Sequence, residues 1–477
     1  MATPRRDSKI PTRAPAPKPR AAKGAAKGAA TGAVAGAVAG AAKGAAKGAV
    51  AGAAKGAVKG EVKTAAKPLV PTPAPVPVMY DAWAVAAPGV EALLEAELRT
   101  IGFPDAAAST GGVAFTCDAS GLARANLHSR LASRVVVRLA AFRATAFHEL
   151  ERSARQIEWA RFVAPKGAFR LRVTAKKSRL YHSDAIAQRV AEAVVRAVPG
   201  AVPVALRGKD DDGDAIESAE ASGVDDSQLI VVRFDHDRCT VSADASGALL
   251  HRRGYRQAVA RAPLRETLAA AMLAAVRYEA SRPLVDPFCG SGTLVIEAAL
   301  MARDIAPGLQ REFAAEQWPE TRAETWRAAR EAARARIKPS AGAPLIGSDR
   351  DSGAIGAAKA NAERAGVSAD VQFVQRALSD LEVPAGPGLL IANPPYGVRV
   401  GESGPLRDLY ARFGQVARAL GAGWQVALLS ADRGLEGQTG LRFTEALKTS
   451  NGGISVRVVT ASVPAHTSSK PSSSPTT

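Results

Sequence analysis

The pattern of apolar and polar positions separates a folded region from two segments that lack a core. Residues 1–78 repeat Ala, Gly, Lys and Pro with few large apolar side chains, and residues 465–477 are rich in Ser, Thr and Pro. Such compositions bury too little apolar surface to offset the entropy of ordering the chain. We therefore expect both segments to be disordered and the folded region to lie between residues 79 and 464.

Residues 79–254 mix short alternating runs, typical of strands, with amphipathic helices. The pattern predicts a ferredoxin-like α+β unit at 79–140 and a second α+β unit at 141–254, with a disordered acidic insertion at about 210–226. The predicted strands are 80–85, 111–115, 135–139, 169–173, 229–234 and 239–242, and the predicted helices are 90–101, 122–131, 147–157 and 183–198, the last capped by Ser183-Asp184.

Residues 255–464 alternate apolar strands with helices, which predicts an α/β domain built on a doubly wound, Rossmann-like parallel sheet. One long helical insertion is predicted at 311–338, and Asn451-Gly452-Gly453 predicts the turn of a final hairpin. The predicted strands are 284–286, 344–349, 371–375, 388–392, 425–430 and 454–459.

The segment D-P-F-C-G-S-G-T at 286–293 predicts the end of a strand, a Gly-rich turn and a helix start. A dinucleotide site needs a third glycine where Val295 stands, and a phosphate loop needs a lysine that is absent. Asp286 would repel a phosphate but could hold an ammonium. We therefore expect S-adenosyl-L-methionine (AdoMet) to contact Asp286, Pro287, Phe288, Gly290, Gly292 and Thr293.

The next two strands carry the remaining cofactor candidates. Asp349 ends the second strand and is placed to bind a ribose diol, whereas we expect Asp351 to cap the following helix, with ribose binding as its alternative role. Many related sites place an acid directly after the third strand to receive the adenine amine. Here Arg376-Ala377 follows that strand, so the nearest candidate is Asp380, with a plain loop role as the alternative.

The fourth strand ends in N-P-P-Y-G at 393–397, which indicates methylation of an exocyclic amine. The lone pair of such an amine is delocalised into the ring, so the amine is a poor nucleophile. Asn393 Oδ1 and the Pro394 carbonyl could accept its N–H bonds, and Tyr396 could stack on the base. A structural Pro-Pro turn after a buried strand is the alternative interpretation, which the G-x-G strand upstream disfavours.

Charge and cysteine content indicate the kind of partner and the cellular compartment. The net charge is +18, and residues 1–78 carry fourteen Lys and Arg against Asp7 and Glu61. A basic chain is attracted to polyanions, so the tail is either a nonspecific nucleic-acid arm, as in histone-like proteins, or a solvated segment without a specific role. Three dispersed cysteines and six scattered histidines predict no disulfide framework and no metal. The sequence also predicts a cytoplasmic protein without a membrane span or an obligate protein partner.

Taken together, D-P-F-C-G-S-G-T, N-P-P-Y-G and L-H-R-R-G-Y-R at 250–256 make residues 80–464 resemble the bacterial THUMP-domain rRNA guanine-N2 methyltransferases. The resemblance implies that 141–254 is a THUMP domain binding structured RNA and that 255–464 methylates guanine N2 in 23S rRNA. It makes Lys176, Lys177, Arg179 and Arg253 candidate phosphate contacts. Some members carry a second C-terminal methyltransferase domain, for which we expect this chain to be too short.

Three alternatives stay open at this point. A tRNA guanine-N2 methyltransferase shares the THUMP domain and both motifs. A noncatalytic RNA-binding or ribosome-assembly protein would keep the fold without the reaction, although the intact Asn393–Tyr396 segment argues against it. A nucleoid-like DNA binder would act through residues 1–78, and deletion of this tail would then abolish nucleic-acid binding.

Overall fold

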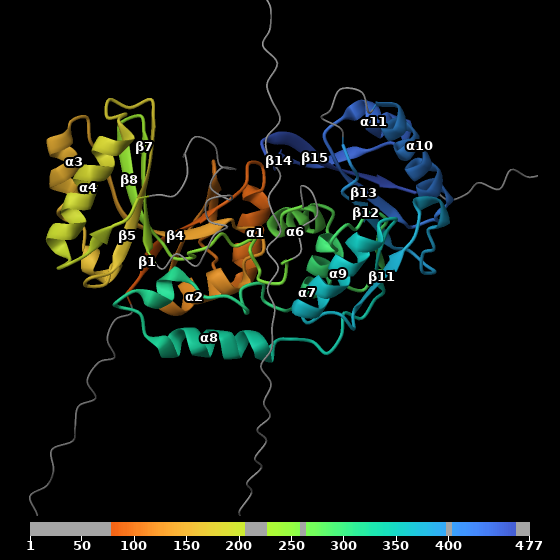
Figure 1. The fold of residues 1–477 in the computed structure, drawn as a ribbon, viewed down its shortest axis with the longest axis horizontal. Coiled ribbons are helices and arrows are strands. Elements are labelled where there is room, and N and C mark those ends of the chain that lie inside the picture. Colours follow the sequence, from red (N-terminus) through yellow and green to blue (C-terminus); the bar gives the residue numbers. More distant parts are fainter. Residues whose placement is uncertain (1–77, 206–226, 258–263, 397–402, 464–477) are drawn as a thin grey trace, which may run out of the picture. The chain divides into compact units, whose positions relative to one another are not determined.

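The computed structural model describes residues 78–205, 227–257, 264–396 and 403–463, which lie in two mixed α/β sheets and their covering helices (Figure 1). The two predicted disordered ends and the acidic insertion at 210–226 fall outside these residues. Among the described residues, no helix is long and apolar enough to cross a membrane.

The first sheet has eight strands in the order β2-β3-β1-β4-β8-β7-β5-β6. Its strands are β1 (Tyr80–Val85), β2 (Ala107–Ser109), β3 (Gly112–Cys117), β4 (Arg134–Arg143), β5 (Ala168–Lys176), β6 (Val202–Pro203), β7 (Gln228–Asp235) and β8 (Arg238–Asp244). Helices α1 (Glu91–Ile101), α2 (Ala119–His128), α3 (Phe147–Ala154) and α4 (Ser183–Ala197) and the 3-10 turn η1 (Trp159–Arg161) pack against it.

The strand β4 joins the two predicted N-terminal units into one sheet. Its first half pairs with β1, and both its halves pair with β8 across a bulge between Arg138 and Ala140. A boundary at residue 140 would therefore cut a ten-residue strand. The predicted cap of α4 is wrong, because its N-cap is His182 and makes no side-chain hydrogen bond to the helix.

The second sheet has seven strands in the order β11-β10-β9-β12-β13-β15-β14. The strands are β9 (Leu284–Asp286), β10 (Leu345–Asp349), β11 (Val371–Gln375), β12 (Leu389–Ala392), β13 (Gln425–Ser430), β14 (Thr444–Asn451) and β15 (Ile454–Ser462). The first five are parallel, and β15 pairs antiparallel with β13. This is the predicted Rossmann-like arrangement, and the order reverses between β9 and β12, where such sheets bind ligands.

The second sheet is covered by the helices α6 (Glu266–Ala275), α7 (Thr293–Ala302), α9 (Ser352–Arg364), α10 (Ser403–Ala419) and α11 (Arg433–Gln438), with the 3-10 turn η4 (Leu378–Asp380). The insertion between α7 and β10 holds the 3-10 turn η3 (Ala314–Gln317) and the helix α8 (Ala323–Ala335), which packs on α2. The hairpin turn predicted at Gly452-Gly453 is confirmed, with φ of 58° and 77°. The single helix predicted at 311–338 is wrong. It is broken into η3 and α8 because Pro319 cannot continue a helix.

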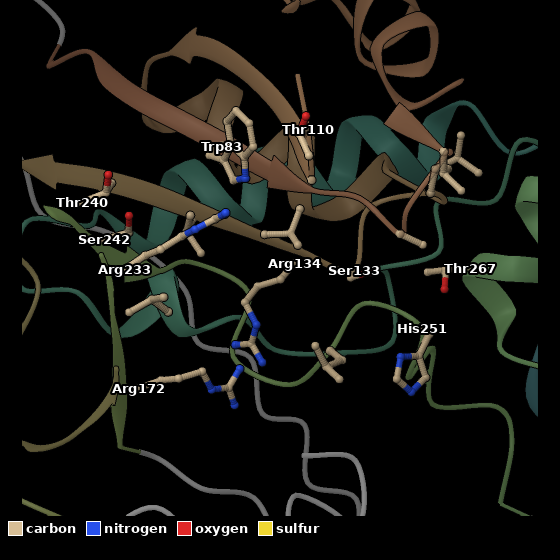
Figure 2. A pocket seen from close by; sticks show the side chains of 18 of the residues that line it. Trp83, Thr110, Ser133, Arg134, Arg172, Arg233, Thr240, Ser242, His251 and Thr267 are labelled. Carbon is tan, nitrogen blue, oxygen red and sulfur yellow. The ribbon is translucent and has the colours of Figure 1, made fainter. Parts of the chain in front are cut away.

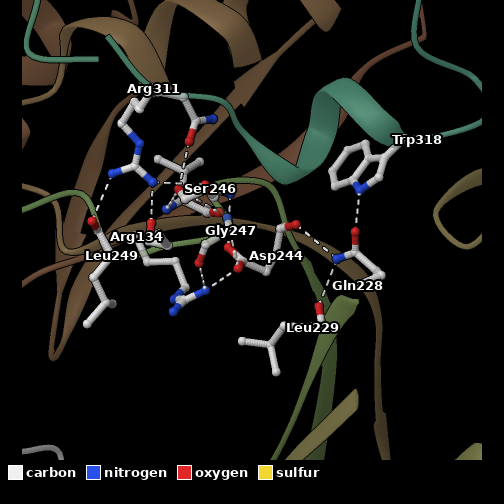
Figure 3. Close-up of polar contacts among 12 residues, drawn as sticks. Arg134, Gln228, Leu229, Asp244, Ser246, Gly247, Leu249, Arg311 and Trp318 are labelled. Atoms are coloured by element: carbon white, nitrogen blue, oxygen red, sulfur yellow. Dashed lines mark hydrogen bonds and ion pairs between the residues drawn. The ribbon is translucent and has the colours of Figure 1, made fainter. Parts of the chain in front are cut away.

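The segment around η3 packs on the first sheet, which explains its break. Trp318 is buried, and its Nε1 donates to Gln228 Oε1 over 2.8 Å (Figure 3). Arg311 donates to the Leu249 carbonyl over 2.8 Å (Figure 3). Next to these contacts the buried Asp244 pairs with Arg134. The insertion therefore ties the domain of the second sheet to the first sheet.

Candidate active site

The glycine turn after β9 has two different physical requirements. Gly290 and Gly292 have φ of 51° and 86°, in the left-handed region that favours glycine. A Cβ on Gly290 would meet nothing within 4 Å, so this position borders open space. A Cβ on Gly292 would lie 2.8 Å from the Phe373 ring. Gly292 is therefore required for packing inside the protein, and Gly290 is the glycine that leaves room for a ligand.

Asp286 is buried at the end of β9, and its Oδ1 accepts a hydrogen bond from the Phe288 amide over 3.0 Å. Burial, with a smaller contribution from the nearby Asp349 carboxylate, raises the pKa of Asp286 to about 8. The Phe288 hydrogen bond opposes this shift. A buried carboxyl of this kind gains an electrostatic partner when a cation binds beside it.

Asp349 ends β10 beside the same turn. Its Oδ2 accepts from the Gly290 amide and its Oδ1 from the Asp351 amide, each over 3.0 Å. A carboxylate has about four acceptor positions, so both oxygens keep capacity for ribose hydroxyls. Asp351 is the N-cap of α9 and accepts from the Gly353 amide over 2.9 Å, which confirms its predicted capping role.

Pro287, Phe288 and Thr293 complete the predicted loop. Pro287 and Thr293 are buried, and Thr293 is the first residue of α7. Phe288 is half-buried, with its ring centroid 6.2 Å from that of Phe413. These side chains pack into the protein, so contacts from this part of the loop to a ligand would come from backbone and the exposed edge of Phe288.

Asn361 was missed by the sequence analysis, although it fixes the loop. It is buried on α9, and its Nδ2 donates to the Ser291 carbonyl over 3.0 Å. Arg364 donates to Asn361 Oδ1 and, over 2.7 Å, to the Tyr255 carbonyl. A polar Asn on the apolar face of a predicted helix was the available signal. The L-H-R-R-G-Y-R segment is thus connected to the cofactor loop through two side chains.

The strand β12 is fully buried between β9 and β13 and delivers Asn393 to the edge where the strand order reverses. Asn393 is half-buried, but its Oδ1 is buried and has no hydrogen-bond partner among the described residues. An unpaired buried acceptor is costly, typically about 1–3 kcal/mol. It therefore indicates a donor that binds at this position.

Tyr396 is half-buried, and burial raises the pKa of its hydroxyl. The hydroxyl accepts a hydrogen bond from Asn451 Nδ2, at the end of β14, over 2.7 Å. The ring is therefore anchored at its far end. Between Asn393 and Tyr396, Pro394 is buried and Pro395 is exposed, and Gly397 lies outside the described residues.

Asp380 is exposed in η4, after the last β11 residue, and its amide donates to the Ala377 carbonyl over 3.1 Å. Arg376 pairs with Glu382 at 2.9 Å. Neither arrangement tests the adenine contact, so Asp380 stays a prediction.

Three of the four predicted RNA contacts are exposed: Lys176 is the last residue of β5, and Lys177 and Arg179 lie in the loop that follows. The hairpin turn between β7 and β8 braces this loop. Asp237 accepts from the Arg179 amide over 2.8 Å and donates its own amide to Ser178 Oγ over 3.0 Å. The loop therefore presents its charges from a fixed backbone.

The fourth predicted contact, Arg253, is wrong. Its side chain is buried and donates to the carbonyls of Leu250 and Arg130 over 2.6 and 2.7 Å. Its Nε lies 3.5 Å from the buried Glu297 carboxylate on α7. The guanidinium is thus a structural link to α7 and cannot reach a phosphate. The run of basic residues at 252–256 gave no sign of this burial.

Three family models match the chain. They describe an RlmL ferredoxin-like domain at residues 81–136, a THUMP domain at 144–210 and an RMKL-like methyltransferase domain at 253–460. These stretches correspond to the N-terminal half of the first sheet, its THUMP portion and the second sheet.

Two relatives illustrate the similarity. The protein slr0064 of Synechocystis sp., which carries the name of an RNA methyltransferase, is 34% identical over 374 residues, covering 78% of this chain and 94% of the relative. The ribosomal RNA large subunit methyltransferase K/L of Syntrophotalea carbinolica is 38% identical over 390 residues, covering 79% of this chain and 53% of the relative. The chain therefore spans about half the length of the second relative.

Two solved structures share the fold over 81% of this chain. One, from Listeria monocytogenes, is named a predicted N6-adenine-specific DNA methylase and has a TM-score of 0.71 at 32% identity, covering 81% of this chain and 97% of its own. The other, SMU.472, is titled as a methyltransferase complexed with SAH (S-adenosylhomocysteine) and has a TM-score of 0.71 at 28% identity, covering 81% and 98%. With the geometry of the site and the coverage of slr0064, these similarities show that the chain belongs to the family of methyltransferases in which an RlmL ferredoxin-like domain and a THUMP domain precede an RMKL-like catalytic domain.

Proposed function

We propose that this protein is an AdoMet-dependent RNA methyltransferase that methylates the exocyclic N2 amine of a guanine in 23S rRNA. The observation that carries the proposal is the buried, unpaired Oδ1 of Asn393 at the end of β12. The K/L relative is named for large-subunit rRNA, and the THUMP match supports RNA as the substrate.

The residues around the turn fit AdoMet as the cofactor, in agreement with the SAH-bound SMU.472. Asp286 offers a buried carboxyl for an ammonium, and Gly290 leaves open space beside it. Asp349 keeps acceptor capacity for a ribose diol. The cofactor, when bound here, supplies an electrophilic methyl group.

In the proposed reaction Asn393 Oδ1 and the Pro394 carbonyl accept the two N–H bonds of the guanine amine. These acceptors turn the nitrogen lone pair out of the ring plane and toward the β9 side of the site. Tyr396, fixed by Asn451, stacks on the base. The proton leaves after the transfer, so positioning and electrostatics carry the rate and no general base is needed.

Adenine N6 is the competing target, because N-P-P-Y also occurs in enzymes that methylate it and the Listeria protein carries that title. Guanine in tRNA is the second competitor. The test incubates the protein with labelled AdoMet and, separately, unmodified 23S rRNA, tRNA and duplex DNA, followed by nucleoside analysis. We expect N2-methylguanosine from 23S rRNA. Label in tRNA would identify tRNA as the substrate in place of 23S rRNA, and N6-methyladenine would overturn the proposal.

Asn393→Ala is the matched variant for the same assay. We expect transfer to fall by about 10²–10³, as when one transition-state hydrogen-bonding group is removed. AdoMet affinity should stay nearly unchanged, because Asn393 faces the base. A normal rate in this variant would show that Asn393 does not hold the target amine. No transfer by the wild-type protein to any of the nucleic acids would favour a noncatalytic RNA-binding function.

A further inference from the structure

One face of the first sheet is polar and basic. Helices α3 and α4 pack on the opposite face, over a core that includes Leu150, Val190, Phe234 and Val241. The alternate residues of β5, β7 and β8 point away from that core. They are Arg172, Thr174, Lys176, Val231, Arg233, Asp235, Arg238, Thr240 and Ser242.

The strand register joins these residues into rows. Arg233 lies opposite Thr174 on β5 and opposite Thr240 on β8. Asp235 lies between Lys176 and Arg238. In the antiparallel β7–β8 pair, residues directly opposite each other have Cβ atoms about 4.5–5.5 Å apart. With Arg138 of β4 opposite Ser242, a surface that we call the basic face (Arg138, Lys176, Arg233 and Arg238) crosses four strands.

The basic face leads from the predicted RNA loop into a cavity of about 650 Å³. Arg138, Arg233 and Arg238 line this cavity, and Figure 2 shows Arg233, Thr240 and Ser242 along one of its walls. Asp235 is the one acidic side chain among the described lining residues. The cavity therefore has an excess of positive charge and hydroxyl groups that suits an anionic sugar–phosphate chain.

Arg138 is held in place at the wall of the cavity. Its guanidinium lies 4.2 Å from the centroid of the Trp83 ring. That ring in turn lies against Gly112, where a Cβ would come within 2.7 Å of it. Arg233 and Arg238 are exposed, and no carboxylate among the described residues pairs with either. Two exposed arginines and one arginine stacked on a tryptophan thus face the cavity.

The other end of the cavity reaches the catalytic half. Thr267 of α6 and Ser450 of β14 line it. The next residue along β14 is Asn451, which donates to the Tyr396 hydroxyl. The β14 end therefore contributes to both the cavity and the anchor of the proposed base-stacking tyrosine.

We infer that the basic face and its cavity bind the phosphate backbone of the RNA strand that leads to the methylated base. This inference rests on the proposed function and extends it to the path of the substrate. A single strand fits a cavity of this size, whereas a double helix does not. The contacts are to phosphate and ribose, so they position the RNA without reading its sequence.

The test measures binding of a fluorescent, unmodified 23S rRNA transcript by anisotropy over a series of KCl concentrations. The test variant is R233Q/R238Q, in which both substituted residues are exposed. We expect at least tenfold weaker binding. We also expect the slope of log affinity against log salt to fall by about 1.4, since each phosphate contact to a single strand contributes about 0.7. AdoMet affinity should be unchanged.

The matched control is Arg196→Gln, an exposed arginine on α4, which packs on the opposite face of the sheet. We expect wild-type affinity and slope for this variant. Wild-type binding by R233Q/R238Q, or equal losses in both variants, would overturn the inference. If only R233Q/R238Q loses RNA affinity while the wild-type protein methylates no RNA, the basic face is supported as an RNA-binding surface. The proposed methyltransferase activity is then contradicted.

Discussion

Asn451 Nδ2 donates a hydrogen bond to the Tyr396 hydroxyl over 2.7 Å, which joins the end of the β14–β15 hairpin to the segment that carries Asn393. The two residues are 55 positions apart in the sequence. The bond holds the outer end of the ring on which we expect the target base to stack.

Loss of this bond should affect the RNA reaction and leave the cofactor site intact. A single hydrogen bond contributes about 1 kcal/mol, so Asn451→Ala and Tyr396→Phe should each lower kcat/KM for RNA by about fivefold to tenfold. The double variant should lose no more than either single variant, because both remove the same bond. Steady-state kinetics at saturating AdoMet checks this, and additive losses would show that the residues act separately.

Asp349 and Asp351 should separate cofactor binding from helix capping. Asp349→Ala removes the acceptor proposed for the ribose diol, so AdoMet affinity should fall by tenfold or more. Asp351→Ala removes the cap of α9 and should cost about 1 kcal/mol of unfolding free energy with little change in affinity. Calorimetric titration and denaturant unfolding measure the two quantities. If Asp349→Ala binds AdoMet with unchanged affinity, a residue other than Asp349 binds the ribose.

AdoMet binding should weaken as the pH falls. Burial raises the pKa of Asp286 to about 8, so below pH 8 the carboxyl is mostly neutral in the free protein. An ammonium binds better to the ionised form, and affinity should therefore drop by up to tenfold for each pH unit below 8. Asp286→Asn should bind weakly and lose this dependence. An AdoMet affinity of the wild-type protein that does not change with pH would show that Asp286 does not bind the cofactor ammonium.

The raised pKa of Asp286 also makes the stability of the free protein depend on pH, in the opposite direction to AdoMet binding. Because the folded-state pKa is raised, the neutral carboxyl is favoured in the fold. This contribution is fully present at acidic pH, below the unfolded-state pKa, and is lost as the pH rises through about 8. Unfolding of the wild-type protein and of Asp286→Asn across this range should diverge accordingly.

Arg253 should act on folding and Lys177 on RNA binding. Arg253→Ala leaves the buried Glu297 carboxylate without its cation, and breaking such a pair typically costs about 3–5 kcal/mol. Lys177→Gln, at an exposed position, should leave unfolding unchanged and weaken RNA binding. Denaturant unfolding and anisotropy check both variants. If Arg253→Ala keeps normal stability but binds RNA weakly, the phosphate contact predicted for Arg253 from the sequence would be supported after all.

The predictable part of the fold is the part with local signals. The strands Tyr80–Val85, Val371–Gln375 and Gln425–Ser430 match their predicted bounds, because apolar runs bounded by polar or turn residues define them. The turn at Gly452-Gly453 was predictable because consecutive glycines accept positive φ.

The parts that could not be predicted depend on contacts between distant segments. Arg253 is buried because α7 brings Glu297 beside it and two backbone carbonyls accept its guanidinium N–H groups. A run of arginines looks the same in the sequence whether it is exposed or buried. Asn361 holds Ser291 across 70 positions, and the basic face exists only after four strands align in register. The motif residues were found because their spacing is local. Their supporting contacts required the tertiary structure.

We propose that the methyl group is transferred to the N2 amine of a guanine held by Asn393. Inosine lacks this amine and is otherwise the same base, so it isolates the reacting group. The most direct measurement is methyl transfer to a 23S rRNA transcript that carries inosine at the modified guanine, compared with the unsubstituted transcript at equal occupancy of the protein. We expect label in the guanine transcript and none in the inosine transcript. Equal label in both transcripts would contradict this proposal.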